Sequence, residues 1–207
     1  MTVDVDDCLF VIQEFMPGSP VETLGRGTVA RLLDLHDQRL VLIPSPAPSR
    51  WPSALIETLT VGGRNYCLHG SLRGYDQRTA LLISRIEEFG RGLHPEDLVA
   101  ADIVHGDLHP GNLLVDQGGL TAIVDTDFAI VGDSAFDLVS LALASLSLPC
   151  DQGVRSRLFA SFDGIDEVRR QVYLAHLFIK NLDWPIRRNR PGHVEFWLER
   201  ADEMLTL

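Results

Sequence analysis

The spacing of apolar side chains along the sequence predicts a mainly helical protein. Residues 28–38 and 76–90 repeat apolar positions three and four residues apart, which is typical of helices with one buried face. A shorter helix is predicted over 53–59. Residues 133–134, an Asp followed by a Ser, can cap the N-terminus of a further helix over 135–146.

The same pattern continues to the end of the chain. Residues 152–205 are predicted to form helices that break near 163–164 and 185–191, where Gly and Pro interrupt the apolar spacing. Four prolines predict a loop over 44–52, and two glycines predict another over 70–74.

A few segments have the shorter, continuous apolar runs that are typical of strands. Cys8–Phe15 is rich in strand-forming residues and is predicted to be a buried strand that stops at a turn. Asp102–Val104 is a second short segment of this type. Leu113–Val115 and Leu120–Val124 flank a Gln-Gly-Gly turn, so they predict one small hairpin in the middle of a helical body.

Composition restricts the classes of partner. The 207 residues are 45% hydrophobic and 23% charged, which are ordinary values for a folded domain. A net charge of −11 would repel a phosphate backbone or an anionic bilayer, so neither nucleic acid nor membrane is an expected partner. Three widely spaced cysteines and no pattern of a signal peptide favour a cytoplasmic protein with free thiols.

The negative charge is concentrated in one part of the sequence. Residues 92–154 contain ten carboxylates and neither Lys nor Arg, so they account for nearly all of the net charge. Such a segment could hold a metal ion and attract a cationic substrate. Lys180 is the only lysine of the chain.

The residues with recognisable chemistry lie inside this acidic segment. Asp107 and Asn112 are five residues apart in a loop stiffened by Pro110, and Asp125 follows the predicted hairpin. Phosphoryl transfer uses this order: a loop Asp accepts the proton of the substrate hydroxyl, and an Asn and a second Asp bind Mg²⁺. The hairpin would bring Asn112 and Asp125 side by side, because one precedes it and the other follows it.

Two other interpretations of this segment remain open. His105, Asp107 and His109 could form a metallohydrolase cluster, although no other His cluster supports it. The same Asp and Asn residues could also be ordinary turn and cap residues, because both types favour turns.

Three linked motifs resemble one known family. They are VHGDLHPGNLLV (104–115), AIVDTDF (122–128) and VGDSAFDL (131–138), and together they resemble the aminoglycoside phosphotransferase and choline kinase-like family. The resemblance implies a protein-kinase-like fold and an enzyme that uses ATP and Mg²⁺ to phosphorylate hydroxyl groups of small molecules.

The resemblance also implies individual roles. Asp107 would be the catalytic base, and Asn112 and Asp125 would be the metal ligands. Asp127 is a further candidate for the metal site, because small-molecule kinases often have an acidic residue there. Two more residues would support the loop. His105 would brace it, and Asp137 would accept its backbone N–H groups.

On the nucleotide side, the resemblance implies contacts to adenine. Leu114 and Val124 would form part of the floor beneath the ring. Backbone groups of Glu14, Phe15 and Met16 would meet its edge, because the first strand resembles the last strand and hinge between two lobes.

The expected fold class is therefore α+β and mainly α: a protein-kinase-like C-terminal lobe with a small β hairpin at the catalytic loop. Residues 1–18 would be the last N-lobe strand and hinge, and residues 19–207 the helical C-terminal lobe with the catalytic and metal-binding loops. The N-terminal lobe is expected to be absent, because few residues precede the hinge. Lys180 comes too late in the chain to be the lysine that such a lobe carries.

Two functions follow from these expectations. The first is an ATP- and Mg-dependent phosphotransferase for a hydroxyl of a small molecule, which could be cationic. It would be incomplete as this chain, and its protein partner could be either another chain that supplies the missing lobe or, in a homo-oligomer, further copies of itself. The alternative is a truncated, non-catalytic binding module that pairs with another chain. The acidic residues near 195–203 would be a solvated helix face or would attract a cationic substrate. Trp184 and Trp197 are expected in the core, with stacking against a ligand as the less favoured role.

Overall fold

The computed structural model describes residues 2–5, 8–11, 15–39 and 49–207. Helices make up most of it, and short strands connect them. The helices are α1 (Arg26–Arg39), α2 (Trp51–Thr60), α3 (His69–Tyr75), α4 (Gln77–Arg91), α5 (Ala135–Ser147), α6 (Gln152–Ala160), α7 (Glu167–Arg187) and α8 (Pro191–Met204), with short 3₁₀ turns η1 (Pro95–Leu98), η2 (Pro110–Asn112) and η3 (Ser161–Gly164).

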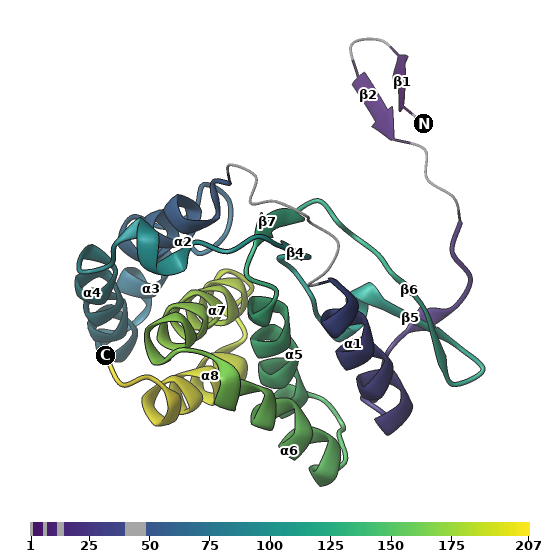
Figure 1. Cartoon of the computed structure of the whole chain (residues 1–207). Helices are drawn as coiled ribbons and strands as arrows, with labels where there is room; N and C mark the ends of the chain where they lie inside the picture. Colours follow the sequence, from purple (N-terminus) through teal and green to yellow (C-terminus); the bar gives the residue numbers. More distant parts are fainter. Residues whose placement is uncertain (1, 6–7, 12–14, 40–48) are drawn as a thin grey trace.

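The strands form three small antiparallel sheets. They are β1 (Thr2–Val5), β2 (Cys8–Val11), β3 (Ser19–Pro20), β4 (Asp102–Val104), β5 (Leu113–Asp116), β6 (Gly119–Ile123) and β7 (Ile130–Gly132). β1 pairs with β2, β4 pairs with β7, and β3, β5 and β6 form a three-stranded sheet in that order. Figure 1 shows the β1–β2 hairpin extending away from the helical body.

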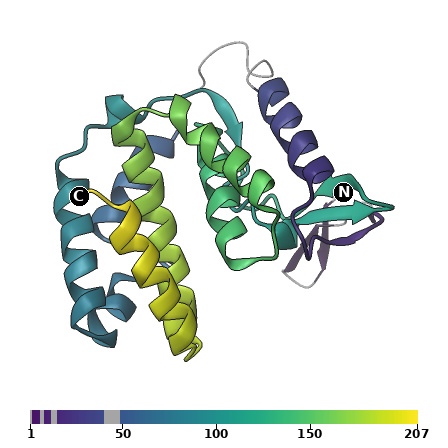
Figure 2. The same ribbon diagram turned by 90° about the horizontal axis from the view of Figure 1, so that it is seen from below.

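Helix α7 is the centre of the helical body. Figures 1 and 2 show α7 and α8 between the group α2–α4 on one side and α5 and α6 on the other. The side chains of α7 are buried along most of the helix, and two of them, Tyr173 and Phe178, are among the largest fully buried residues. Phe136 of α5 packs edge-on against Tyr173, with ring centroids 5.6 Å apart. This packing fixes α7 against the start of α5, and both helices carry residues of the site described below.

Most of the elements predicted from the sequence are confirmed. α1, α2, α4 and α5 cover the predicted helices, and the β5–β6 hairpin turns at the predicted Gln-Gly-Gly. Within the predicted strand over Cys8–Phe15, the structure has β2 at Cys8–Val11 and no strand at Phe15, and residues 12–14 lie outside the described residues. The segment 102–104 is a strand as predicted, and it pairs with β7, which the pattern did not predict.

The predicted loop over 70–74 is wrong, because these residues lie inside α3. Packing explains the difference. Leu72 is fully buried, and His69 contacts Glu87 (Nδ1 to Oε1, 2.6 Å) and the carbonyl oxygen of Thr58 (Nε2 to O, 2.8 Å). These contacts with α2 and α4 outweigh the roughly 1 kcal/mol that each glycine costs within a helix.

In the part of the chain that the structure describes, no helix combines the length and the apolar character needed to cross a membrane.

Candidate active site

The loop with the predicted catalytic residue connects β4 to β5. Gly106 lies in this loop with φ +81°, a conformation that favours glycine. A Cβ atom at this position would lie 2.6 Å from the carbonyl oxygen of Phe128. Glycine is therefore needed here for two reasons, its backbone conformation and the close approach of residues 125–129.

The carboxylate of Asp137 holds the start of this loop. It lies in the first turn of α5 and is 1% exposed. Its Oδ2 accepts a hydrogen bond from the backbone N–H of His105 (2.8 Å), and its Oδ1 accepts one from that of Gly106 (3.1 Å). Hydrogen bonds to a buried carboxylate are stronger than those between neutral groups, so α5 positions the loop rigidly.

His105 and Asn112 connect the loop to the hairpin. Nε2 of His105 lies 2.9 Å from the carbonyl oxygen of Val124, and its Nδ1 accepts the N–H of Asp107 at 3.3 Å. The side-chain Nδ2–H of Asn112 donates to the backbone carbonyl oxygen of Asp107 (3.0 Å). The backbone carbonyl oxygen of Asn112 accepts the backbone N–H of Val124 (2.9 Å). The fold thus joins Asp107, Asn112 and Val124, the residue that precedes Asp125, by hydrogen bonds.

Asp125 and Asp127 lie just beyond the end of β6. Both are exposed, and Asp125 has φ +62°, which turns the chain sharply after the strand. Within the described residues, no group of three or more His, Cys, Asp or Glu side chains could hold a metal. Mg²⁺ does not need such a group, because it commonly uses one or two carboxylates together with water and phosphate oxygens. The amide oxygen of Asn112 and the carboxylate of Asp125 are hard donors of this kind.

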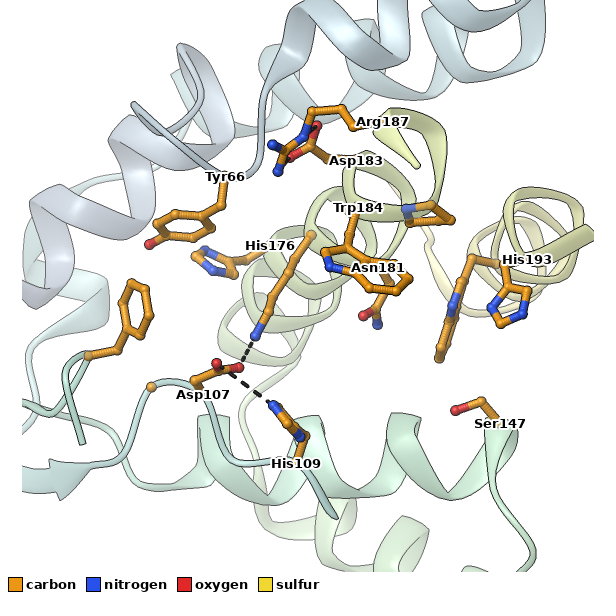
Figure 3. A pocket seen from close by; sticks show the side chains of 15 residues that line it. Tyr66, Asp107, His109, Ser147, His176, Asn181, Asp183, Trp184, Arg187 and His193 are labelled. Atoms are coloured by element: carbon orange, nitrogen blue, oxygen red, sulfur yellow. Dashed lines mark hydrogen bonds and ion pairs between the residues drawn. The ribbon is translucent and has the colours of Figure 1, made fainter. Parts of the chain in front are cut away.

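Lys180 is the residue of this site that sequence reasoning missed. It lies on α7, and its ammonium group forms an ion pair with Oδ1 of Asp107 (Figure 3). The two residues are 73 positions apart, so no local pattern connects them. The one available signal was that Lys180 is the only lysine in an acidic chain.

A cavity of about 460 Å³ opens above Asp107. One wall comes from α7, whose residues His176 and Trp184 are labelled in Figure 3. Lys180 lines the cavity from the same helix. The opposite wall includes Tyr66 and Phe128, whose rings pack edge-on with centroids 5.4 Å apart.

The two tryptophans of this region behave differently from each other. Trp197 is 7% exposed and belongs to the core, as predicted. Trp184 is 41% exposed and lines the cavity, so its prediction as a core residue is wrong. The reason is its position on α7: it follows Lys180 by one helical turn and shares the face that the cavity leaves open.

The histidines around the cavity have lowered pKa values. Complete burial, assisted by the charge of Lys180, lowers the pKa of His176 to about 3. Burial also lowers the pKa of His109, against the opposing effect of Asp107, whose Oδ2 is 3.9 Å from Nε2 of His109. Both rings are therefore neutral at pH 7 and add no positive charge to the cavity.

The residues predicted to contact adenine lie on the other side of the hairpin. Pro20 of β3 is paired with Leu114 of β5, and Leu114 and Val124 are partly buried. Phe15 is 87% exposed and Met16 is 39% exposed, so both are accessible next to this sheet. Glu14, the fifth residue predicted to contact adenine, lies outside the described residues.

Comparison with known proteins identifies the family. The model of the phosphotransferase enzyme family (APH) matches residues 3–172 of the 207. The chain belongs to the phosphotransferase enzyme family. The resemblance noted in its sequence motifs is thereby confirmed. No curated protein sequence matches this family member significantly.

Solved structures of phosphotransferases share its fold. A thermostable mutant of the aminoglycoside phosphotransferase APH(4)-Ia in its apo form matches with a TM-score of 0.68 at 12% identity, over 99% of this chain and 74% of that one. A ternary complex of that enzyme with ADP and hygromycin B gives 0.68 at 13% identity, over 98% and 75%. The choline kinase from Cryptosporidium parvum Iowa II gives 0.53 at 12% identity, over 92% and 70%. The α+β, mainly helical, kinase-like fold is confirmed.

Proposed function

We propose that this phosphotransferase family member transfers the γ-phosphoryl group of ATP to a hydroxyl group of a small molecule. The observation that carries the proposal is the position of Asp107. Its loop is held by the buried carboxylate of Asp137, and its side chain faces a cavity large enough for a small molecule. Phosphoryl transfer depends mainly on positioning and charge, and both are supported by this arrangement.

In this proposal Asp107 is the catalytic base. One of its carboxylate oxygens contacts Lys180, and the side chain is 17% exposed, so the other oxygen is available to a hydroxyl group in the cavity. Asp107 would accept the hydroxyl proton as the oxygen attacks the phosphorus atom. His105 and Asp137 would act only by holding the loop, because both are buried behind it.

Asn112 and Asp125 would hold Mg²⁺ through an amide oxygen and a carboxylate oxygen, with Asp127 close by in the same turn. The ion would offset the negative charge of the phosphate groups. ATP would bind beside the hairpin, where Phe15, Met16, Leu114 and Val124 would contact adenine. Solved complexes of the aminoglycoside phosphotransferase with ADP or AMP-PNP and hygromycin B support the use of a nucleotide and a hydroxyl-bearing acceptor.

The division of the chain is part of the same proposal. Residues 1–18 would correspond to the last strand and hinge of an N-terminal lobe, and residues 19–207 would form the lobe with the catalytic and metal-binding loops. The hydrogen bond from Oγ1 of Thr121 to the carbonyl oxygen of Pro17 (2.8 Å) is consistent with a hinge segment that rests on the hairpin.

The test is ADP release by the full chain with Mg·ATP and a panel of alcohols. Asp107→Asn should lower turnover by about 10²–10⁴-fold, the usual contribution of a general base. Asp116→Asn is the matched control, because Asp116 lies on the same hairpin and is exposed. Full turnover by the Asp107→Asn protein would refute the assignment. If the wild-type chain binds Mg·ATP in calorimetry but phosphorylates no alcohol, the non-catalytic binding module is favoured instead.

A further inference from the structure

The charges around the cavity restrict the substrate that it can take. Asp107 and Asp183 are the two carboxylates among the described residues that line it. Both already form ion pairs, Asp107 with Lys180 and Asp183 with Arg187. A polycationic substrate would need carboxylates whose charge is not already compensated, and both of these have a cationic partner within the protein.

Asp183 has no capacity left for an ammonium group of a ligand. Its side chain is 1% exposed. It accepts hydrogen bonds from Nε of Arg187 at 2.9 Å, from Nη2 of Arg187 at 3.0 Å and from Oγ of Ser71 at 2.6 Å. A cation could reach this carboxylate only if it displaced a charge-assisted, two-point contact with arginine.

The acidic face of α8 does not compensate. Glu195 and Asp202 both contact Arg78 (2.6 and 3.2 Å), and Glu203 contacts Arg200 (3.0 Å). None of these carboxylates lines the cavity, to which α8 contributes His193 and Trp197. The sequence left two roles open for this face, and its ion pairs support a solvated, self-compensated surface.

Positive charge lies next to the cavity instead, around the lining residue Trp184. The guanidinium groups of Arg188 and Arg190 lie over the ring of Trp184, 4.5 and 5.0 Å from its centroid. Both arginines are exposed, and neither forms an ion pair with any carboxylate in the described part of the chain. With Arg187 they place three arginines within four positions at the end of α7, in a protein whose net charge is −11.

We propose that the acceptor substrate is an anionic alcohol: a hydroxyl compound with a flat, apolar body and a carboxylate. The hydroxyl group would meet Asp107, the apolar body would pack between Trp184 and the Tyr66–Phe128 pair, and the carboxylate would face Arg188 and Arg190. This inference rests on the proposed function, because it names the substrate class of the same site. It predicts that a polycationic alcohol binds this site less well than an anionic one.

The test compares three probes that share one scaffold and differ in charge. They are 4-(hydroxymethyl)benzoate, 4-(hydroxymethyl)benzamide and 4-(hydroxymethyl)benzylamine, which carry −1, 0 and +1. Each is titrated into the ¹⁵N-labelled full chain at low salt without ATP. The indole N–H signal of Trp184 reports binding in the cavity, and that of buried Trp51 is the internal reference.

We expect the benzoate to bind about fivefold to tenfold more tightly than the benzylamine, because each exposed charge contact changes affinity by a small factor. The double variant Arg188→Gln/Arg190→Gln should remove most of this difference. Arg31→Gln/Arg157→Gln is the matched control: it removes the same charge from exposed positions on α1 and α6 and should preserve the difference.

Equal or tighter binding of the benzylamine would overturn the inference, and so would the absence of any shift at Trp184 with all three probes. These outcomes are independent of the proposed function, because no nucleotide is present. A chain that prefers the benzoate but shows no phosphotransfer would refute the function and leave the binding preference intact. A chain that prefers polycationic alcohols over anionic ones and phosphorylates them through Asp107 would support the function and refute the inference.

Discussion

The buried imidazole of His176 makes the stability of this fold depend on pH in a calculable way. It lies on α7 with 7% of its surface exposed, and its ring centroid is 5.2 Å from that of Phe136 and 6.3 Å from that of Tyr66. Its Nδ1 has no hydrogen-bond partner within the described residues. Burial, with a smaller effect of Lys180, lowers its pKa to about 3.

The sign of the effect follows from the difference between the folded and unfolded pKa. The pKa of the imidazole in the unfolded chain is about 6.5. Below that pH the unfolded chain binds a proton at His176, whereas the folded chain does not. Stability from this group is therefore complete above pH 6.5 and is lost as the pH falls. Because pH 5 lies about 1.5 pH units below the unfolded pKa and each unit corresponds to about 1.36 kcal/mol, the free energy of unfolding falls by about 2 kcal/mol between pH 8 and pH 5.

Urea unfolding of the wild type and of His176→Leu at pH 8 and pH 5 measures this loss. Carboxylates titrate in both proteins, so the difference between their pH responses isolates His176. We expect the wild type to lose about 2 kcal/mol more than the variant over this range. His94→Gln, which removes an exposed histidine, should retain the wild-type response. Equal pH responses of the wild type and His176→Leu would refute the reasoning.

Three further predictions concern the catalytic loop. Asp137→Asn should destabilise the fold by about 1–3 kcal/mol in urea unfolding, because its amide nitrogen cannot accept a hydrogen bond and one of the N–H groups of His105 and Gly106 loses its acceptor. Gly106→Ala should cost about 2–4 kcal/mol or prevent folding, because its φ is +81° and its Cβ would meet Phe128; unchanged stability would contradict the close approach. Lys180→Met should lower kcat about 10–100-fold with little change in melting temperature, and Lys180→Arg should retain more activity; full activity of Lys180→Met would exclude a positioning role.

Local sequence signals predicted most of the elements and the composition of the candidate site. Helical spacing located α1, α4 and α5, and the turn residues located the β5–β6 hairpin. Asp107, Asn112 and the residue before Asp125 lie together because they flank one hairpin, which the sequence order alone implied. Such features depend on neighbours in the chain, so one sequence is enough to predict them.

Features that depend on distant contacts could not be predicted in this way. Helix α3 contains two glycines and forms because His69 and Leu72 are buried against neighbouring helices. Lys180 contacts Asp107 only because α7 passes beside the catalytic loop, and Trp184 is exposed because the same face borders a cavity. No periodicity or motif reports which face of a long buried helix will border a cavity.

The distribution of charge in the fold favours a different substrate from the one that composition alone suggests. The acidic segment 92–154 suggested a site for cations, including a cationic substrate. In the fold, Asp125 and Asp127 are exposed beyond β6 and form no ion pair within the described residues, so the free negative charge lies where Mg²⁺ is proposed to bind. At the cavity, Lys180 compensates Asp107, and the guanidinium groups of two arginines lie over the ring of Trp184. Local pairing, rather than net charge, therefore decides which ligand each side of the site can take.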